Sequence, residues 1–192
     1  SGVGTFERSR AWVGRWWQGR FGAAVPMPVV DNGSGLSRDE RITADALLAL
    51  LRDAAAHPVA GPVLNQSLAV AGLDGTATRM GERGIMKLAL GNARIKTGSL
   101  RDVAAVAGYV HTQSGTPWAV VGIVNHPNAS QGRPALDALL EWVASQTRLP
   151  AEWIAPTCRR WIASQGESGP ELSSCARIGP GDASPSTTAP TS

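Results

Sequence analysis

Residues 93–100, which read ARIKTGSL, decide the fold of this chain. The β-branched Ile95 and Thr97 favour an extended backbone, and Gly98 leaves one position of the strand without a side chain. Two further apolar runs follow, at residues 103–112 and 118–125, and the intervening QSGTP is typical of a hairpin connection. The pattern predicts three sequential antiparallel strands, of which residues 93–100 form the first.

The tripeptide Lys96-Thr97-Gly98 within this strand predicts a binding site for a peptide that ends in a carboxylate. An ammonium and a neighbouring hydroxyl on a strand edge can hold such a group, and Lys96 and Thr97 would fill these roles. Gly98 lacks a Cβ, so an extended substrate could lie against the strand and form main-chain hydrogen bonds with it. Taken alone, the same tripeptide is also common at solvated strand ends, so its context decides between a binding site and an ordinary strand end.

Helices are expected before and after the strands. An amphipathic pattern over residues 5–20 predicts a helix whose aromatic side chains, Phe6, Trp16 and Trp17, pack in the core. Thr43 is a candidate N-cap for a helix over residues 44–56, a short helical piece is expected at residues 62–68, and Pro134 begins a closing helix that ends near residue 145. This order predicts an α+β fold, an antiparallel sheet packed by helices.

Two loops are of functional interest. Residues 31–38, DNGSGLSR, contain two glycines and several short polar side chains, which favour a tight turn in which Asp31 accepts from the amides that follow it. The stretch that opens with GLDGT at residues 72–76 continues without a clear period to residue 92. Because long ordered loops of compact domains often carry function, we expect this second loop to border the site.

Composition limits the classes of function. The 192 residues are 43% hydrophobic and 17% charged, enough for one sizeable core. The net charge of +3 comes from arginines scattered along the chain, so no nucleic-acid partner is expected. No His/Cys spacing resembles a metal site, and no metal or cofactor is expected. Cys158 and Cys175 could pair in an oxidising compartment or remain free thiols.

The domain organisation changes near residue 150. Residues 1–150 carry the periodic patterns, whereas residues 151–192 become rich in Gly, Pro, Ser, Thr and Ala, and we expect an irregular, largely disordered tail there. The chain has no starting Met, and we expect that it begins part-way through its domain.

Three stretches taken together, residues 31–38, 72–76 and 96–100, resemble the D-alanyl-D-alanine carboxypeptidase/endopeptidase family. These are the low-molecular-mass class C penicillin-binding proteins, peptidase family S13, and the resemblance covers residues 1–146. It implies a partial penicillin-binding transpeptidase (serine β-lactamase-like) fold. It also implies hydrolysis of peptidoglycan stem peptides ending in D-Ala-D-Ala, in the periplasm, through a serine acyl-enzyme without cofactor, with β-lactams as inhibitors. Lys96, Thr97 and Gly98 match the family's substrate-binding strand, and residues 31–38 match a structural loop near the cleft.

The chain departs from the family at the catalytic motifs. The nucleophile of the family lies in Ser-x-x-Lys, but the residues three before Lys87 and Lys96 are Gly84 and Ala93. No asparagine completes a Ser-x-Asn motif either. No Gly-x-Ser-x-Gly elbow is present, and the three histidines lack a partner motif, so no catalytic residue is assigned.

We therefore expect the C-terminal part of a serine D-Ala-D-Ala carboxypeptidase, inactive alone. The alternative is a non-catalytic peptidoglycan-binding module that uses the same strand only to dock stem peptides. A serine β-lactamase fragment ranks below both, because it shares Lys-Thr-Gly but not the loop at residues 31–38.

Overall fold

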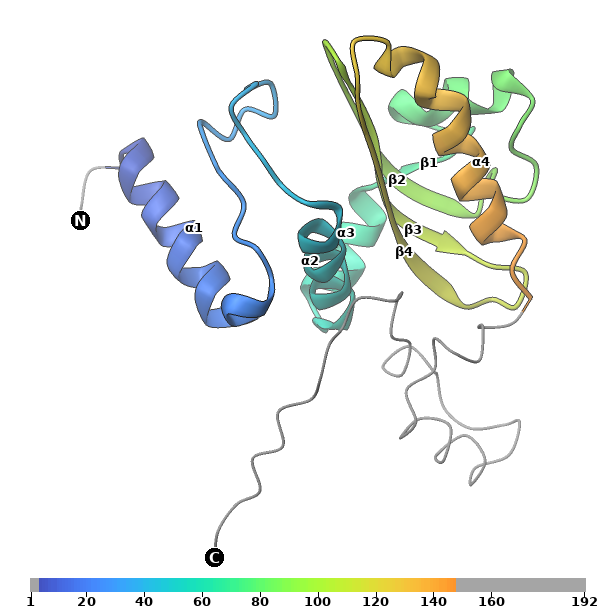
Figure 1. Ribbon diagram of the computed structural model, residues 1–192. Helices are drawn as coiled ribbons and strands as arrows, with labels where there is room; N and C mark the ends of the chain where they lie inside the picture. Colours follow the sequence, from blue (N-terminus) through green and yellow to red (C-terminus); the bar gives the residue numbers. More distant parts are fainter. Residues whose placement is uncertain (1–3, 148–192) are drawn as a thin grey trace, which may run out of the picture. The chain divides into compact units, whose positions relative to one another are not determined.

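The computed structural model describes residues 4–147 (Figure 1). The tail expected at residues 151–192, with Cys158 and Cys175, lies outside the described residues. Within residues 4–147, no single helix has the length and apolar composition to cross a bilayer, and only the bent pair formed by α2 and α3, defined below, passes that test by length and composition.

A four-stranded antiparallel sheet in the order β1-β2-β3-β4 forms the centre of the fold. Its strands are β1 (Ala69–Val70), β2 (Ala93–Leu100), β3 (Val103–His111) and β4 (Pro117–Asn125). The expected strand at residues 93–100 has the predicted bounds, but it is the second strand and not the first. The sequence pattern missed β1, because two residues are too few to show a period and are defined only by their pairing with β2.

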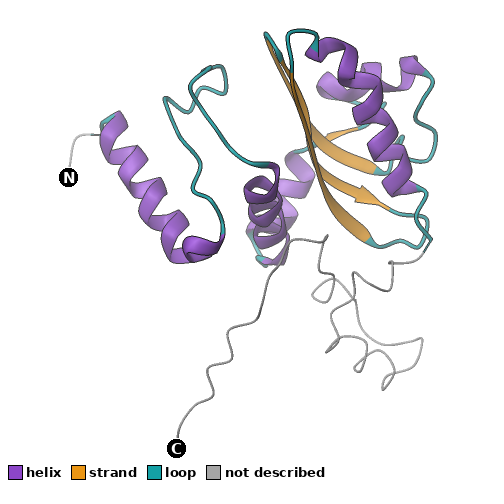
Figure 2. Ribbon diagram, viewed as in Figure 1, coloured by secondary structure: helices purple, strands orange, loops and turns teal. Residues whose placement is uncertain are grey.

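Helices lie on both sides of the sheet (Figure 2). On one side, the Tyr109 hydroxyl of β3 donates to the Leu51 carbonyl of α2 (Ala44–Ala56) at 2.7 Å. On the other side, α4 (Arg133–Ala144) packs so closely that a Cβ at Gly122 of β4 would lie 2.6 Å from Leu136. The absence of a side chain at Gly122 therefore lets α4 approach the sheet.

The predicted helices begin and end close to their expected residues. Thr43 caps α2 by accepting from the Ala46 amide, as the sequence predicts. The short helical piece is α3 (Ala60–Ser67), and the closing helix α4 buries Leu136, Leu140 and Val143. It also buries Asp137, which is 1% exposed and which the hydrophobic pattern did not indicate.

The first helix, α1 (Phe6–Phe21), is capped by Thr5 and corrects one expectation. Trp17 is buried at 2% exposure and contacts Phe21, but Phe6 and Trp16 are 61% and 39% exposed. The expected core stripe is therefore wrong for these two residues. An ion pair between Arg20 and Asp53 joins α1 to α2.

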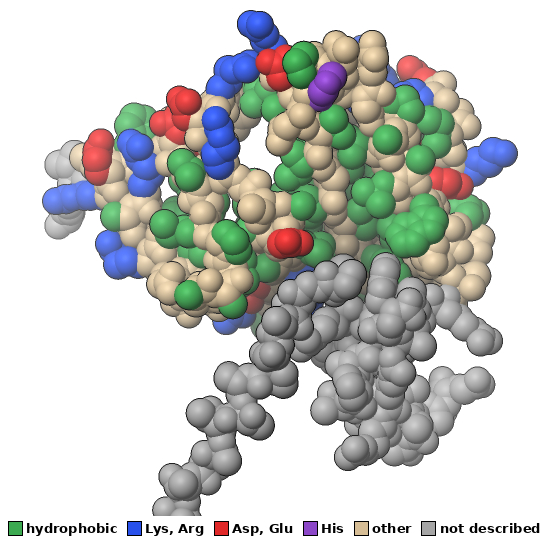
Figure 3. All heavy atoms as spheres, viewed as in Figure 1, with side chains coloured by type: hydrophobic (Ala, Val, Ile, Leu, Met, Phe, Trp, Pro, Cys, Tyr) green, Lys and Arg blue, Asp and Glu red, His purple; other side chains and the backbone are tan. Residues whose placement is uncertain are grey.

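Three 3-10 helices complete the described chain: η1 (Gly22–Ala24), η2 (Gly75–Arg83) and η3 (Ala129–Gly132). The second lies in the stretch that the sequence left irregular. On the face drawn in Figure 3, the Lys and Arg side chains are dispersed among acidic and hydrophobic ones and form no continuous stripe.

Candidate functional site

The edge of β2 is open beyond its first residues. β1 pairs only with Arg94 and Ile95, so within residues 4–147 no strand lies beside residues 96–100 on that side. The Ala71 amide donates to the Ala93 carbonyl at 2.9 Å, which shows that the backbone groups of Ala93 point toward β1. Because these groups alternate along a strand, those of Thr97 and Ser99 point to the same side, where the edge is open. This edge can accept an extended peptide as an added strand.

A cavity of about 670 Å³ lies along this open edge. Its walls come from η2, β2, β3 and α4, and Lys96, Thr97 and Gly98 all line it. The structure therefore brings the three residues singled out in the sequence to one cavity. Their role in binding substrate stays a prediction.

Lys96 lies at the edge of β2 with an exposed side chain. Its Nζ donates to the carbonyl oxygen of Thr97 at 2.7 Å, so the ammonium lies over the backbone of the open edge. Within residues 4–147, Lys96 forms no ion pair with an acidic side chain. A carboxylate arriving at the edge would meet a cation that no described acidic group neutralises.

Thr97 is held by a residue of the second loop. Its hydroxyl lies 2.8 Å from that of Thr76, and either can be the donor. The backbone before Thr76 is fixed by Asp74, whose carboxylate accepts from the Val70 amide at 2.6 Å, and by Gly75, whose φ of +52° is strained for residues with a side chain. We expected the loop that opens with GLDGT to border the site, but the sequence did not single out Thr76, the last residue of GLDGT, as a site residue.

Ser99 and Arg133 also line the cavity, and neither was predicted as a site residue from the sequence. Arg133, the first residue of α4, donates from Nη2 to Ser99 Oγ at 3.1 Å. Ser99 follows Thr97 by two residues, so both hydroxyls lie on one face of β2. The period of two could have indicated Ser99, whereas nothing local indicates Arg133.

An ion pair lies in the wall that η2 and α4 share. Arg83 donates to both carboxylate oxygens of the buried Asp137, with Nη2 to Oδ1 at 2.7 Å. The hydrogen bonds that Arg83 donates to Asp137 raise the pKa of Arg83 above its ordinary value, so the guanidinium stays charged. The pair joins two walls of the cavity and adds little net charge to it.

The loop at residues 31–38 is a tight turn, as expected, but other side chains hold it. Asn32 accepts from the Ser34 amide at 2.9 Å, and Ser34 accepts from the Leu36 amide at 3.1 Å. Within the described residues, no following amide donates to the Asp31 carboxylate, so the expected role of Asp31 is wrong. Asn32 is the acceptor instead, because its short side chain reaches the backbone amide two residues further on.

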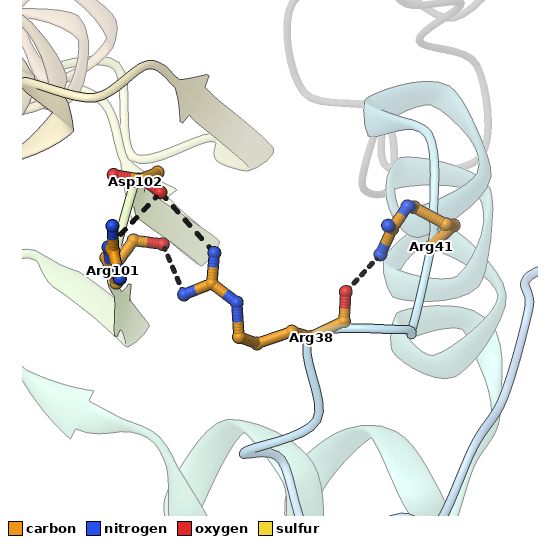
Figure 4. A network of polar contacts seen from close by, with 4 residues as sticks. All are labelled: Arg38, Arg41, Arg101 and Asp102. Carbon is orange, nitrogen blue, oxygen red and sulfur yellow. Dashed lines mark hydrogen bonds and ion pairs between the residues drawn. The ribbon is translucent and has the colours of Figure 1, made fainter.

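The end of this loop is tied to the β2–β3 turn (Figure 4). Arg38 donates to the Arg101 carbonyl and to the Asp102 carboxylate, each at 3.4 Å. Asp102 has a φ of +66°, and its carbonyl accepts from the His126 amide. The loop thus lies at the end of β2, beyond the residues that line the cavity.

The described histidines and acidic residues do not form a metal centre. In residues 4–147, no three His, Cys, Asp or Glu side chains lie close enough to hold a metal ion. His57 Nδ1 accepts from the amides of Val59 and Ala60, which caps the start of α3. The expectations of no metal and no cofactor stay predictions.

The chain is similar in sequence to carboxypeptidases. The sequence model of the D-Ala-D-Ala carboxypeptidase 3 (S13) family matches residues 3–146. Carboxypeptidase DacB of Mycolicibacterium smegmatis is 38% identical over 111 residues, which are 56% of this chain and 24% of that protein. The chain therefore spans about a quarter of the length of this curated relative.

Solved structures show the same fold. Penicillin binding protein 4 (dacB) of Haemophilus influenzae is 25% identical with a TM-score of 0.51, over 62% of this chain and 29% of that one. The structure of its complex with a β-lactam is 24% identical with a TM-score of 0.57, over 71% of this chain and 34% of that one. These likenesses confirm the predicted α+β fold as part of a penicillin-binding transpeptidase-like fold.

Proposed function

Since the chain belongs to the D-Ala-D-Ala carboxypeptidase 3 (S13) family, we propose that it forms part of a serine-type D-Ala-D-Ala carboxypeptidase/endopeptidase that acts on peptidoglycan stem peptides in the periplasm. In this proposal the chain supplies the substrate-binding strand and one side of the cleft. The nucleophile belongs to polypeptide outside this sequence, because neither lysine completes Ser-x-x-Lys.

The observation that carries the proposal is the open edge of β2 beside Lys96. A stem peptide would add to this edge through its main chain, with the backbone groups of Thr97 and Ser99 as partners. Its terminal carboxylate would bind the Lys96 ammonium and the Thr97 hydroxyl. Gly98 would let the peptide backbone approach, since the strand presents no Cβ at that position.

In this proposal the intact enzyme works through a serine acyl-enzyme. A lysine-activated serine attacks the carbonyl of the penultimate D-Ala, the terminal D-Ala leaves as its amine, and water then hydrolyses the acyl ester. Lys96 and Thr97 orient the substrate and take no part in bond breaking. Holding the peptide in a fixed position beside the nucleophile is itself a large part of such catalysis.

The same site would meet β-lactams in the intact enzyme. A relative of the same fold, penicillin binding protein 4 of Haemophilus influenzae, has been solved in complex with a β-lactam. We propose β-lactams as inhibitors of the intact enzyme, and no metal as a participant.

A non-catalytic peptidoglycan-binding module is the second candidate, and the missing Ser-x-x-Lys and Ser-x-Asn motifs favour it. Both candidates use the same strand to dock stem peptides. They differ in whether a nucleophile belongs to the same protein. The β-lactamase fragment has less support, because the matched family is that of D-Ala-D-Ala carboxypeptidases.

Two experiments on the 192-residue chain test the proposal. Co-sedimentation with purified peptidoglycan is expected to bring down the chain and to lose the Lys96→Ala variant. Labelling with a fluorescent penicillin is expected to give no covalent adduct. A chain that stays in the supernatant contradicts the docking strand, and an adduct shows that a nucleophile is present.

A further inference from the structure

The hydroxyl of Thr97 has a single hydrogen-bond partner within residues 4–147, the hydroxyl of Thr76. The two oxygens lie 2.8 Å apart, and either hydroxyl can donate to the other. A threonine hydroxyl has one proton to donate and two lone pairs that accept. If Thr97 donates to Thr76, its proton is used up, whereas if Thr76 donates, the Thr97 proton is free. The direction of this one bond therefore decides whether Thr97 can donate to a ligand.

The backbone on both sides of Thr76 is fixed by the start of η2. The buried residue Ala77 follows Thr76 directly. The Ala77 amide donates to the Asp74 carbonyl at 3.2 Å, and the Ala77 carbonyl accepts from the Gly72 amide at 3.1 Å. The Thr76 hydroxyl is thus held within reach of Thr97, and both side chains line the cavity.

A carboxylate bound to Thr97 would determine the direction of the bond. Because a carboxylate can only accept, Thr97 has to give it the single proton of its hydroxyl. The bond between the two threonines is then possible only with Thr76 as the donor. Hydroxyls that donate in series polarise one another, so this bond makes Thr97 a stronger donor. The gain is larger for a charged acceptor than for a neutral one.

A carboxamide in the same place would leave the direction open. Its oxygen accepts but its NH2 group donates, so Thr97 can accept from the ligand and donate to Thr76. No net charge then polarises the two hydroxyls. The bond from Thr76 should therefore favour a peptide that ends in a free carboxylate over one that ends in an amide.

We propose that Thr76 is a positioning residue, which donates to Thr97 and so directs the Thr97 proton toward the terminal carboxylate of a bound peptide. Thr76 acts through Thr97 and does not itself bind the peptide. This role rests on the proposed docking of a stem peptide at β2, and the test below separates the two. It gives the loop that opens with GLDGT a specific part in selecting the substrate.

Two acetylated peptides serve as probes, one ending in D-Ala-D-Ala and the other in the C-terminal amide of the same sequence. The dissociation constant of each is measured with the full 192-residue chain by titration calorimetry. Thr76→Val removes the hydroxyl and nearly keeps the shape of the side chain. It is expected to reduce the preference for the acid over the amide by about 3- to 10-fold, as for the loss of one hydrogen bond. Thr76→Ser keeps a hydroxyl and should retain most of the wild-type preference.

A double-mutant cycle tests whether Thr76 acts through Thr97. Thr97→Val should itself weaken binding of the acid, and adding Thr76→Val to it should cause no further loss. Thr78→Val is the matched control, because this neighbouring threonine of η2 donates to the Gly75 carbonyl at 3.0 Å and not to Thr97. It should keep the wild-type preference for the acid.

An unchanged preference in Thr76→Val would overturn the role of Thr76 while leaving the docking strand intact. A further loss on adding Thr76→Val to Thr97→Val would show that Thr76 acts on the ligand by another route, and so contradict the proposal. Failure of both peptides to bind the wild-type chain would overturn the docking strand, and this role with it. Thr76 is exposed, so unfolding midpoints close to wild type are expected, and the smaller Thr76→Ala should repeat the effect of Thr76→Val.

Discussion

The guanidinium of Arg83 binds the carboxylate of Asp137 through two hydrogen bonds and so joins η2 to α4. The two ends of this pair differ in their access to water. The Asp137 side chain is 1% exposed, whereas that of Arg83 is 29% exposed. Both residues line the cavity, so the pair fixes η2 against α4 in the cavity wall.

Removing Arg83 is therefore expected to cost more stability than removing the charge of Asp137. Arg83→Met leaves a buried carboxylate without a partner and should lower the free energy of unfolding by about 3–5 kcal/mol. Asp137→Asn leaves a guanidinium that can reach water and should cost about 1–3 kcal/mol. Urea unfolding of both variants at neutral pH measures the difference. Equal losses of stability in the two variants would contradict the explanation from unequal burial.

Glu141 of α4 gives the chain a pH-dependent tie to the loop before β2. Its carboxylate accepts from the amides of Lys87, Leu88 and Ala89 at 2.8–3.1 Å. Partial burial raises the pKa of Glu141, but these amides and the charge of Lys87 together outweigh it and hold the pKa below its ordinary value.

Since the pKa of Glu141 is lower in the folded chain, the carboxylate stabilises the fold above its unfolded pKa of about 4.3, and this contribution is lost as the pH falls through the folded pKa. Glu141→Gln should cost about 1–3 kcal/mol at pH 7 and should weaken the loss of stability on acidification. Urea midpoints from pH 7 to pH 3 measure this. Glu82→Gln is the control and should keep the wild-type pH profile, so an identical flattening in both variants would argue against the tie.

Gly98 should matter to binding more than to stability. A Cβ at this position would lie 3.3 Å from that of Ala105, which a small shift can relieve. Gly98→Ala is expected to change the free energy of unfolding by less than about 1 kcal/mol and to weaken binding of a D-Ala-D-Ala peptide about tenfold. Titration with the peptide, together with thermal unfolding, gives both quantities.

Gly108 of β3 is the contrasting position. A Cβ there would lie 2.2 Å from the Arg94 carbonyl and 2.8 Å from Ile95 Cα, both in the backbone of β2. Gly108→Ala should therefore destabilise the chain by about 1–3 kcal/mol. Wild-type stability in this variant would show that the two strands can separate more easily than their pairing implies.

The parts of the fold that local chemistry determines could be predicted from the sequence. The N-cap Thr43 and the apolar period predict α2, and the β-branched residues predict β2. Each of these signals lies in the element that it defines or directly beside it. The site depends on contacts between distant residues, which no local pattern records. Thr76 and Thr97 are 21 residues apart, Ser99 and Arg133 are 34 apart, and Arg83 and Asp137 are 54 apart.

The exposed aromatic side chains of α1 illustrate a related difference. The sequence shows that Phe6 and Trp16 lie on one helical stripe, and such stripes usually pack in a core. Only Trp17 does so here. Periodicity identifies a face of a helix but does not identify what covers it.

The Lys96 ammonium is proposed to hold the terminal carboxylate of a stem peptide, and one comparison tests this role most directly. The affinity of an acetylated peptide ending in D-Ala-D-Ala is compared with that of its C-terminal amide, for the wild-type chain and for Lys96→Ala. Lys87→Ala, which changes the only other lysine of the chain, is the matched control. We expect the wild-type chain and the Lys87 variant to prefer the acid by about tenfold or more, and Lys96→Ala to lose this preference. An undiminished preference for the acid in Lys96→Ala would contradict the account.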